Sequence, residues 1–149
     1  MLLYFRYGTT NFIGTLDTEP YVHYQGRTYA KWSGFSKIRY DLFIKNIAAQ
    51  MDKPWNKGLG KASYQLDDYS TLYAVAQCTE DLTMDSSAKL CLQALTAAIQ
   101  QFQDYCGDAD GCRVVSSSCY VRYETYPFFG IFKGKNSNNT EKALNQSSP

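Results

Sequence analysis

The chain has 149 residues, of which 44% are hydrophobic and 19% charged, and its formal net charge is +1. A chain of this size buries roughly 70% of the surface that its unfolded form exposes, which is enough for a stable core. Because basic and acidic residues are interspersed, the sequence excludes a nucleic-acid-binding stripe and a polybasic membrane patch. It also contains no apolar run of about 18 residues, which a membrane span requires.

A short duplicated segment indicates an internal repeat. The sequence RYGTTNFIG at residues 6–14 matches RYETYPFFG at residues 122–130 in five of nine positions without a gap. Repeated signatures indicate tandem units, so we expect residues 1–14 to be the tail of a truncated first repeat. Residues 15–29 are predicted to form a linker, with a first strand as the alternative, since they combine turn residues with scattered aromatics.

Two amphipathic helices are predicted from the spacing of apolar residues. The first covers residues 35–51, with Ser36 as its N-cap, and the second covers residues 88–105. The second helix has the stronger stripe, which includes Cys91, Leu95, Ala98, Ile99 and Phe102. In the first helix, the apolar face is expected to consist of Tyr40, Ile44, Ile47, Ala48 and Met51.

Strands are predicted between and after these helices. They fall in residues 56–64, in residues 70–78 and on both sides of three serines within residues 112–132. The 13 tyrosines and 8 phenylalanines also favour a sheet. The order of elements is typical of an α+β domain with an antiparallel sheet under two helices, here over residues 30–132. The polar residues 133–149 are expected to form a disordered tail.

Three motifs in this region occur together and in order: YAVAQC at residues 73–78, CL at 91–92 and CYVRYE at 119–124. These three motifs and their order resemble the cysteine-rich repeat of plant secretory proteins, the ginkbilobin-like or stress-antifungal domain. That domain also forms ectodomains of cysteine-rich receptor-like kinases and plasmodesmata-located proteins. The resemblance implies an α+β fold in which two helices pack on a five-stranded antiparallel sheet.

All five cysteines lie between residues 78 and 119, without histidines at metal-ligand spacing. Such clustering indicates disulfides and an oxidising compartment, and the odd count leaves at least one thiol unpaired. The resemblance implies that Cys91 pairs with Cys119. The family partners of Cys78 and Cys106 are absent, so a Cys106–Cys112 bond and a bond from Cys78 to Cys106 or Cys112 both stay open.

An enzymatic function is not expected. His23 is the only histidine and lies in the linker-like segment, which disfavours a Cys-His pair or a histidine-ligated metal. The segment KGLGK at residues 57–61 lacks the residues of a phosphate-binding loop. We therefore expect no cofactor and no metal site.

A sugar site is implied by the family resemblance. Its mannose-binding members use an Asn, an Arg and a Glu, of which the last two correspond to Arg113 and Glu124, while the Asn has no counterpart. A guanidinium and a carboxylate suit neighbouring sugar hydroxyls as donor and acceptor. Both side chains share a face only if the serine turn has an even number of residues. The alternative is a cross-strand ion pair between Arg113 and Glu124.

The expected function is a non-enzymatic protein secreted to the plant apoplast, which binds a mannose-type glycan or a cell-surface protein and has a defence role. Two glycosylation sequons, at Asn138 and Asn145, are weak support for secretion. Because the chain starts without a signal peptide, we expect a truncated gene or a fragment. The alternatives are an interaction module with a decayed ligand site and an ectodomain fragment of a receptor-like kinase.

Overall fold

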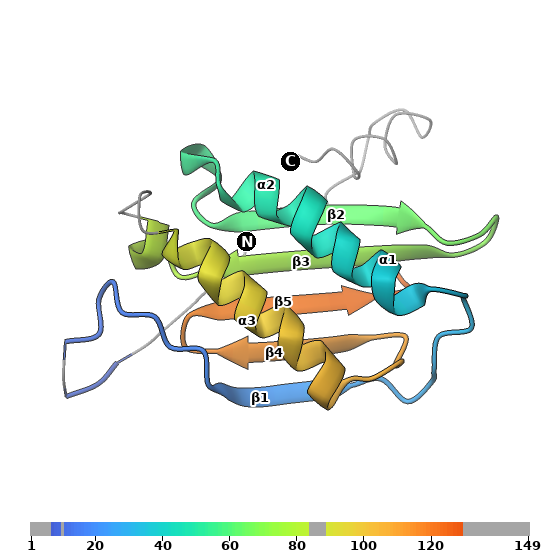
Figure 1. Cartoon of the computed structure of the whole chain (residues 1–149), viewed down its shortest axis with the longest axis horizontal. Helices are drawn as coiled ribbons and strands as arrows, with labels where there is room; N and C mark the ends of the chain where they lie inside the picture. Colours follow the sequence, from blue (N-terminus) through green and yellow to red (C-terminus); the bar gives the residue numbers. More distant parts are fainter. Residues whose placement is uncertain (1–6, 10, 84–88, 130–149) are drawn as a thin grey trace.

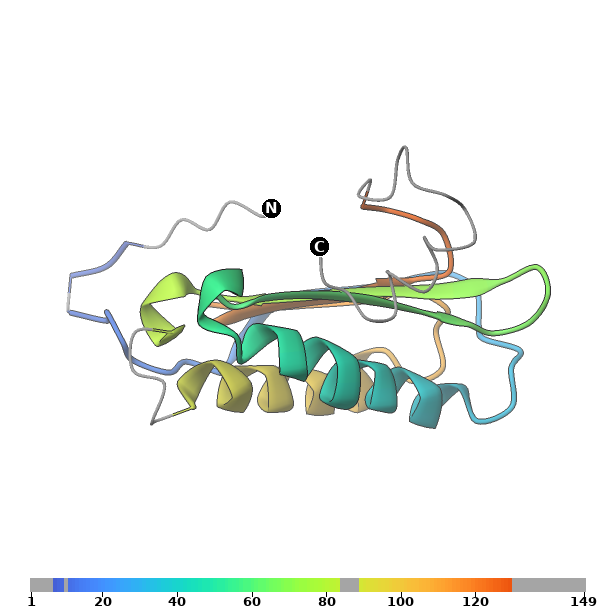
Figure 2. The ribbon, with the colours of Figure 1, turned by 90° about the horizontal axis from the view of Figure 1, so that it is seen from above.

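The computed structural model describes residues 7–9, 11–83 and 89–129 (Figure 1). Its centre is a five-stranded antiparallel sheet in the order β1-β4-β5-β3-β2. The α-helices lie on one face of this sheet (Figure 2), which confirms the predicted α+β fold. No helix in the described part of the chain is long and apolar enough to cross a membrane. The strands are β1 (Pro20–Gln25), β2 (Leu59–Gln65), β3 (Thr71–Cys78), β4 (Cys112–Ser116) and β5 (Cys119–Glu124).

The first helix runs without interruption over the predicted range but changes its winding in the middle. It consists of α1 (Phe35–Asp41), a π-helix (Leu42–Ile47) and α2 (Ala48–Met51). The wider π turn shifts the buried face, so Leu42 and Phe43 are buried while Tyr40 is exposed, contrary to the predicted stripe. The predicted cap at Ser36 is also wrong, because the helix begins after Gly34, which has a φ of 71° and makes no side-chain cap.

This first helix packs very closely on the edge of the sheet. A Cβ atom added to Gly60 of β2 would lie 2.7 Å from the backbone oxygen of Ile47. Only a residue without a side chain therefore allows this approach. After the helix, a 3-10 turn at Pro54–Asn56 leads into β2.

The second helix, α3 (Leu90–Tyr105), carries the predicted apolar stripe. It buries Cys91, Leu95, Ala98, Ile99 and Phe102 against the sheet, which confirms the periodicity. The Phe102 ring lies 5.4 Å from the ring of Phe43 and 5.0 Å from that of Tyr123. These three aromatic side chains join both helices to β5 in one core. A 3-10 turn at Glu80–Thr83 precedes the helix.

The sheet begins earlier in the chain than the expected domain boundary at residue 30. Strand β1 lies within the segment 15–29 and pairs with β4, so the alternative of a first strand describes this segment better than a linker. The described residues between 7 and 14 form no strand. Residues 133–149 and the sequons at Asn138 and Asn145 lie outside the described residues. The division into a first-repeat tail and a polar tail stays a prediction.

The disulfides differ in part from the expectation. Cys78 is bonded to Cys91, with their Cα atoms 5.6 Å apart, while Cys119 is a buried free thiol. The implied Cys91–Cys119 bond is therefore wrong in this structure. The reason is that Cys78 and Cys119 are register partners at the same end of β3 and β5, and Cys78 takes the bond to Cys91. Cys106 is bonded to Cys112, one of the alternatives that the sequence left open.

Candidate carbohydrate-binding site

The face of the sheet opposite the helices carries both predicted sugar-binding residues. Arg113 of β4 lies directly opposite Arg122 of β5, because Val115 pairs with Tyr120 and an even number of residues forms the turn. Glu124 follows two residues later on β5, so all three side chains point to the same face. The geometric condition for a shared site is therefore met.

Glu124 is held in an almost fully enclosed position, with 6% of its surface exposed. Its carboxylate lies against the backbone of Gly111, where an added Cβ would be 2.6 Å from Oε2. Arg122 Nη2 lies 3.9 Å from Glu124 Oε2. Burial raises the pKa of this carboxyl group, and Arg122 opposes that shift. Gly111 thus leaves room for the Glu124 carboxylate, whose negative charge is only partly compensated by Arg122.

Arg113 occupies the open side of this face. Its guanidinium lies 5.3 Å from the ring centre of Tyr24, the residue opposite it on β1. Within the described chain, Arg113 has no carboxylate within 4.0 Å. The alternative of an Arg113–Glu124 ion pair is thus not formed, and Glu124 instead faces Arg122.

Two aromatic residues lie beside these charged side chains. The Tyr24 side chain is 52% exposed beside Arg113, and Tyr126 accepts a hydrogen bond of 2.9 Å from Arg122. We refer to Tyr24, Arg113, Arg122, Glu124 and Tyr126 as the sheet-face cluster. Tyr24 was missed because its strand lies in the presumed linker, although the aromatic and β-branched residues of YVHY at positions 21–24 are a strand signal.

Replacing Glu124 with glutamine is expected to stabilise the fold at neutral pH. The folded-state pKa lies above the ordinary value of 4.5, so the folded chain holds this proton more tightly and stability falls as the pH rises through the folded pKa. Glutamine stays neutral throughout. Its advantage should disappear below pH 4.5, which urea unfolding at several pH values would measure. A pH-independent difference, or an equal gain in the exposed control Glu19→Gln, would contradict this explanation.

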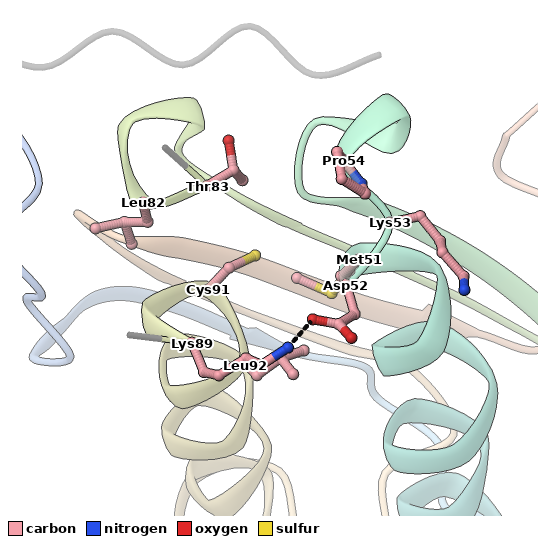
Figure 3. A pocket seen from close by; sticks show the side chains of 9 residues that line it. All are labelled: Met51, Asp52, Lys53, Pro54, Leu82, Thr83, Lys89, Cys91 and Leu92. Atoms are coloured by element: carbon pink, nitrogen blue, oxygen red, sulfur yellow. Dashed lines mark hydrogen bonds and ion pairs between the residues drawn. The ribbon is translucent and has the colours of Figure 1, made fainter. Parts of the chain in front are cut away.

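A cleft away from the sheet-face cluster is too small for a sugar. It encloses about 40 Å³ between the end of α2 and the start of α3, whereas ligand sites typically measure about 300–1,000 Å³. An ion pair of 2.9 Å between Lys89 and Asp52 crosses it (Figure 3). Cys91 lines this cleft, but its sulfur is already bonded to Cys78.

The described residues do not assemble a reactive centre. His23 stacks on Tyr105 with ring centres 4.5 Å apart, away from any free thiol. Burial raises the pKa of the Cys119 thiol to about 12, so it is protonated and poorly nucleophilic at neutral pH. Among the described residues, no group of three or more His, Cys, Asp or Glu side chains is placed to hold a metal ion.

Comparison with known proteins shows to which family the chain belongs. Residues 23–126 match the family described as Salt stress response/antifungal. The chain belongs to this family. Membership confirms the resemblance drawn from the cysteine motifs and identifies a non-enzymatic domain.

Curated members of the salt stress response/antifungal family are longer than this chain. It is 39% identical to cysteine-rich repeat secretory protein 55 of Arabidopsis thaliana, covering 85% of this chain and 47% of that protein. It is 47% identical to an antimicrobial ginkbilobin-2-like protein of Castanea crenata, covering 83% of this chain and 49% of the relative. The chain therefore spans about half the length of these relatives.

One more distant relative is longer still. The match to cysteine-rich receptor-like protein kinase 34 of Arabidopsis thaliana is 28% identical and covers 86% of this chain but 20% of the kinase. Among solved structures, the tandem DUF26 ectodomain of the Arabidopsis thaliana cysteine-rich receptor-like protein PDLP8 aligns with a TM-score of 0.62 at 17% identity. That alignment covers 78% of this chain and 53% of the ectodomain. It shows that the fold is shared.

Proposed function

We propose that this chain is a secreted recognition module that binds a mannose-type glycan through the sheet-face cluster. The observation that carries this proposal is the placement of Arg113 and Glu124 on one face, with neither paired to the other. The names of two relatives, a secretory protein and an antimicrobial protein, support an extracellular location and a role in defence.

The chemistry of the sheet-face cluster suits a sugar. The exposed Arg113 guanidinium can donate two parallel hydrogen bonds to neighbouring hydroxyls, and the Glu124 carboxylate can accept from a third. Tyr24 lies beside Arg113, and about half of its surface is exposed. An exposed aromatic ring offers the apolar face of a sugar a surface to pack on.

Calorimetric titration with mannose and mannan tests this function. We expect saturable heat from the oxidised protein, and a loss of at least about tenfold in affinity for Arg113→Ala, because a charge-assisted hydrogen bond is removed. Glu124→Ala should weaken the affinity by a similar factor. Lys45→Ala changes an exposed cation on the helical layer and should leave the affinity unchanged. Absence of heat up to millimolar sugar would refute glycan binding.

A protein-binding role is the second candidate, and one feature favours it. The sheet-face cluster combines Arg with exposed Tyr, the residue types that are enriched at protein interfaces. The matched kinase indicates that such a module can belong to a longer receptor-like protein. If no sugar binds, retention of an extracellular protein partner by the chain, and its loss in Arg113→Ala, would establish this role.

A further inference from the structure

A second polar site lies on the opposite side of the molecule from the sheet-face cluster. It is a groove of about 460 Å³ between the first helix and α3. This volume lies within the range of about 300–1,000 Å³ that small-ligand sites occupy. The residues that line the groove are Gly34, Ser36, Lys37, Arg39, Tyr40, Ile99 and Gln103.

Arg39 is the unusual residue of this groove, because it is a buried cation with 3% of its surface exposed. Its Nη1 donates hydrogen bonds of 2.9 Å to the backbone oxygen of Gly107 and of 2.9 Å to the hydroxyl of Tyr123. No carboxylate of the described chain lies within 4.0 Å of Arg39, and its Nε and Nη2 donate to none of the described residues. One of the three guanidinium nitrogens, Nη1, is thus fixed, and the edge formed by Nε and Nη2 has no acceptor among the described residues.

The surroundings of Arg39 stabilise its charge without using the available edge. The guanidinium carbon lies 5.4 Å from the ring centre of Phe102 and 5.0 Å from that of Tyr123, which are cation–π distances. Gly107 follows the C-terminus of α3, where the helix dipole also favours a cation. Both effects hold the guanidinium in place. They leave Nε and Nη2 without an acceptor among the described residues.

The other side chains of the groove add hydroxyl-binding groups and a ring surface. Tyr40 is 49% exposed, and Ser36 and Gln103 make no side-chain hydrogen bond to any described residue. Lys37 forms an ion pair of 2.6 Å with Asp41, whose carboxylate also lies 3.5 Å from Lys45. The groove therefore offers one free guanidinium edge, two neutral polar side chains and one aromatic ring.

We propose that this groove binds an acidic sugar through its single carboxylate. A carboxylate matches the free edge of Arg39 as a two-point acceptor, and one cationic edge suits a monoanion better than a sulfate or phosphate dianion. The hydroxyls of the ring would meet Ser36 and Gln103, and its apolar face would pack on Tyr40. The site is separate from the sheet-face cluster and goes beyond the glycan binding proposed there.

The test is an amide-detected NMR titration of the oxidised chain with galacturonate, with galactose as the neutral match and sulfate as the inorganic anion. We expect saturable shifts at α1 and α3 with galacturonate and none with galactose. Arg39→Met, which keeps an apolar stem, should weaken this binding at least about tenfold. Equal shifts with galactose, or sulfate binding as tight as galacturonate binding, would overturn the acidic-sugar assignment.

Further variants keep the test decisive if Arg39→Met does not fold. Tyr40→Ala changes an exposed side chain and should weaken galacturonate binding severalfold, while Tyr69→Ala, in the exposed turn between β2 and β3, should not. Unchanged binding in Tyr40→Ala would also refute the proposal. Arg113→Ala should retain galacturonate binding, so failure of the mannose experiment and failure of this one are distinguishable.

Discussion

Replacing Phe102 with alanine is expected to lower the free energy of unfolding by about 3–5 kcal/mol. The Phe102 side chain is buried between both helices and β5, with the rings of Phe43 and Tyr123 on either side. It also lies under the Arg39 guanidinium, so the truncation removes a cation–π contact and leaves a cavity beside a buried charge. The effect should therefore fall in the upper part of this range.

Urea unfolding followed by circular dichroism would measure the change. Tyr105→Ala is the matched control, because Tyr105 lies in the same helix but is exposed and contacts only His23 among the ring pairs of the described residues. We expect the control to cost less than about 1 kcal/mol. A Phe102→Ala variant that is no less stable than the control would show that the aromatic core does not hold the two layers together.

Removing the Cys78–Cys91 bond by changing both residues to alanine is expected to cost about 3 kcal/mol. The bond closes a loop of 13 residues in sequence separation, and a closed loop of about 15 residues stabilises a fold by about 3 kcal/mol through the entropy of the unfolded chain. The Cys106–Cys112 bond has a separation of 6. Its removal should cost less, because a shorter loop restricts the unfolded chain less.

Single substitutions distinguish this connectivity from the implied Cys91–Cys119 bond. If Cys78 is bonded to Cys91, Cys78→Ala should remove most of the stability that the bond contributes. Cys119→Ala should then change the free energy of unfolding little. Mass mapping of an unreduced digest should recover a peptide that links Cys78 to Cys91. Cys119 should resist alkylation until the chain is unfolded, because its thiol is buried with a pKa of about 12. A large loss in Cys119→Ala alone would contradict the observed pairing.

The fold was predictable where a regular pattern repeats over many residues. The apolar stripe of α3 and the strands on both sides of the serine turn are strong signals, and their burial follows directly from periodicity. The π turn of the first helix has no such signal, since its phase is set by packing over Gly60. Strand β1 was ambiguous because it lies at the edge of the sheet and begins with a proline.

The sites were predictable to different degrees. Strand alternation places Arg113 and Glu124 on one face once the turn length is known, so the resemblance and the geometry lead to the same residues. Arg39 could not be identified in this way, because a charged residue in an amphipathic helix ordinarily belongs to the solvated face. Its burial depends on Tyr123 and Gly107, which are distant in sequence. The cysteine pairing likewise depends on three sulfur-bearing positions meeting at one end of the sheet.

The alternation of β5 makes the two proposed sites share one strand. Arg122 and Glu124 belong to the open face, while Tyr123 between them holds Arg39 on the other side. Insertion of one residue into β5 would exchange the two faces, burying charges under the helices and withdrawing the hydroxyl that positions Arg39. Length changes in homologous chains should therefore fall in the loops and leave this six-residue strand intact.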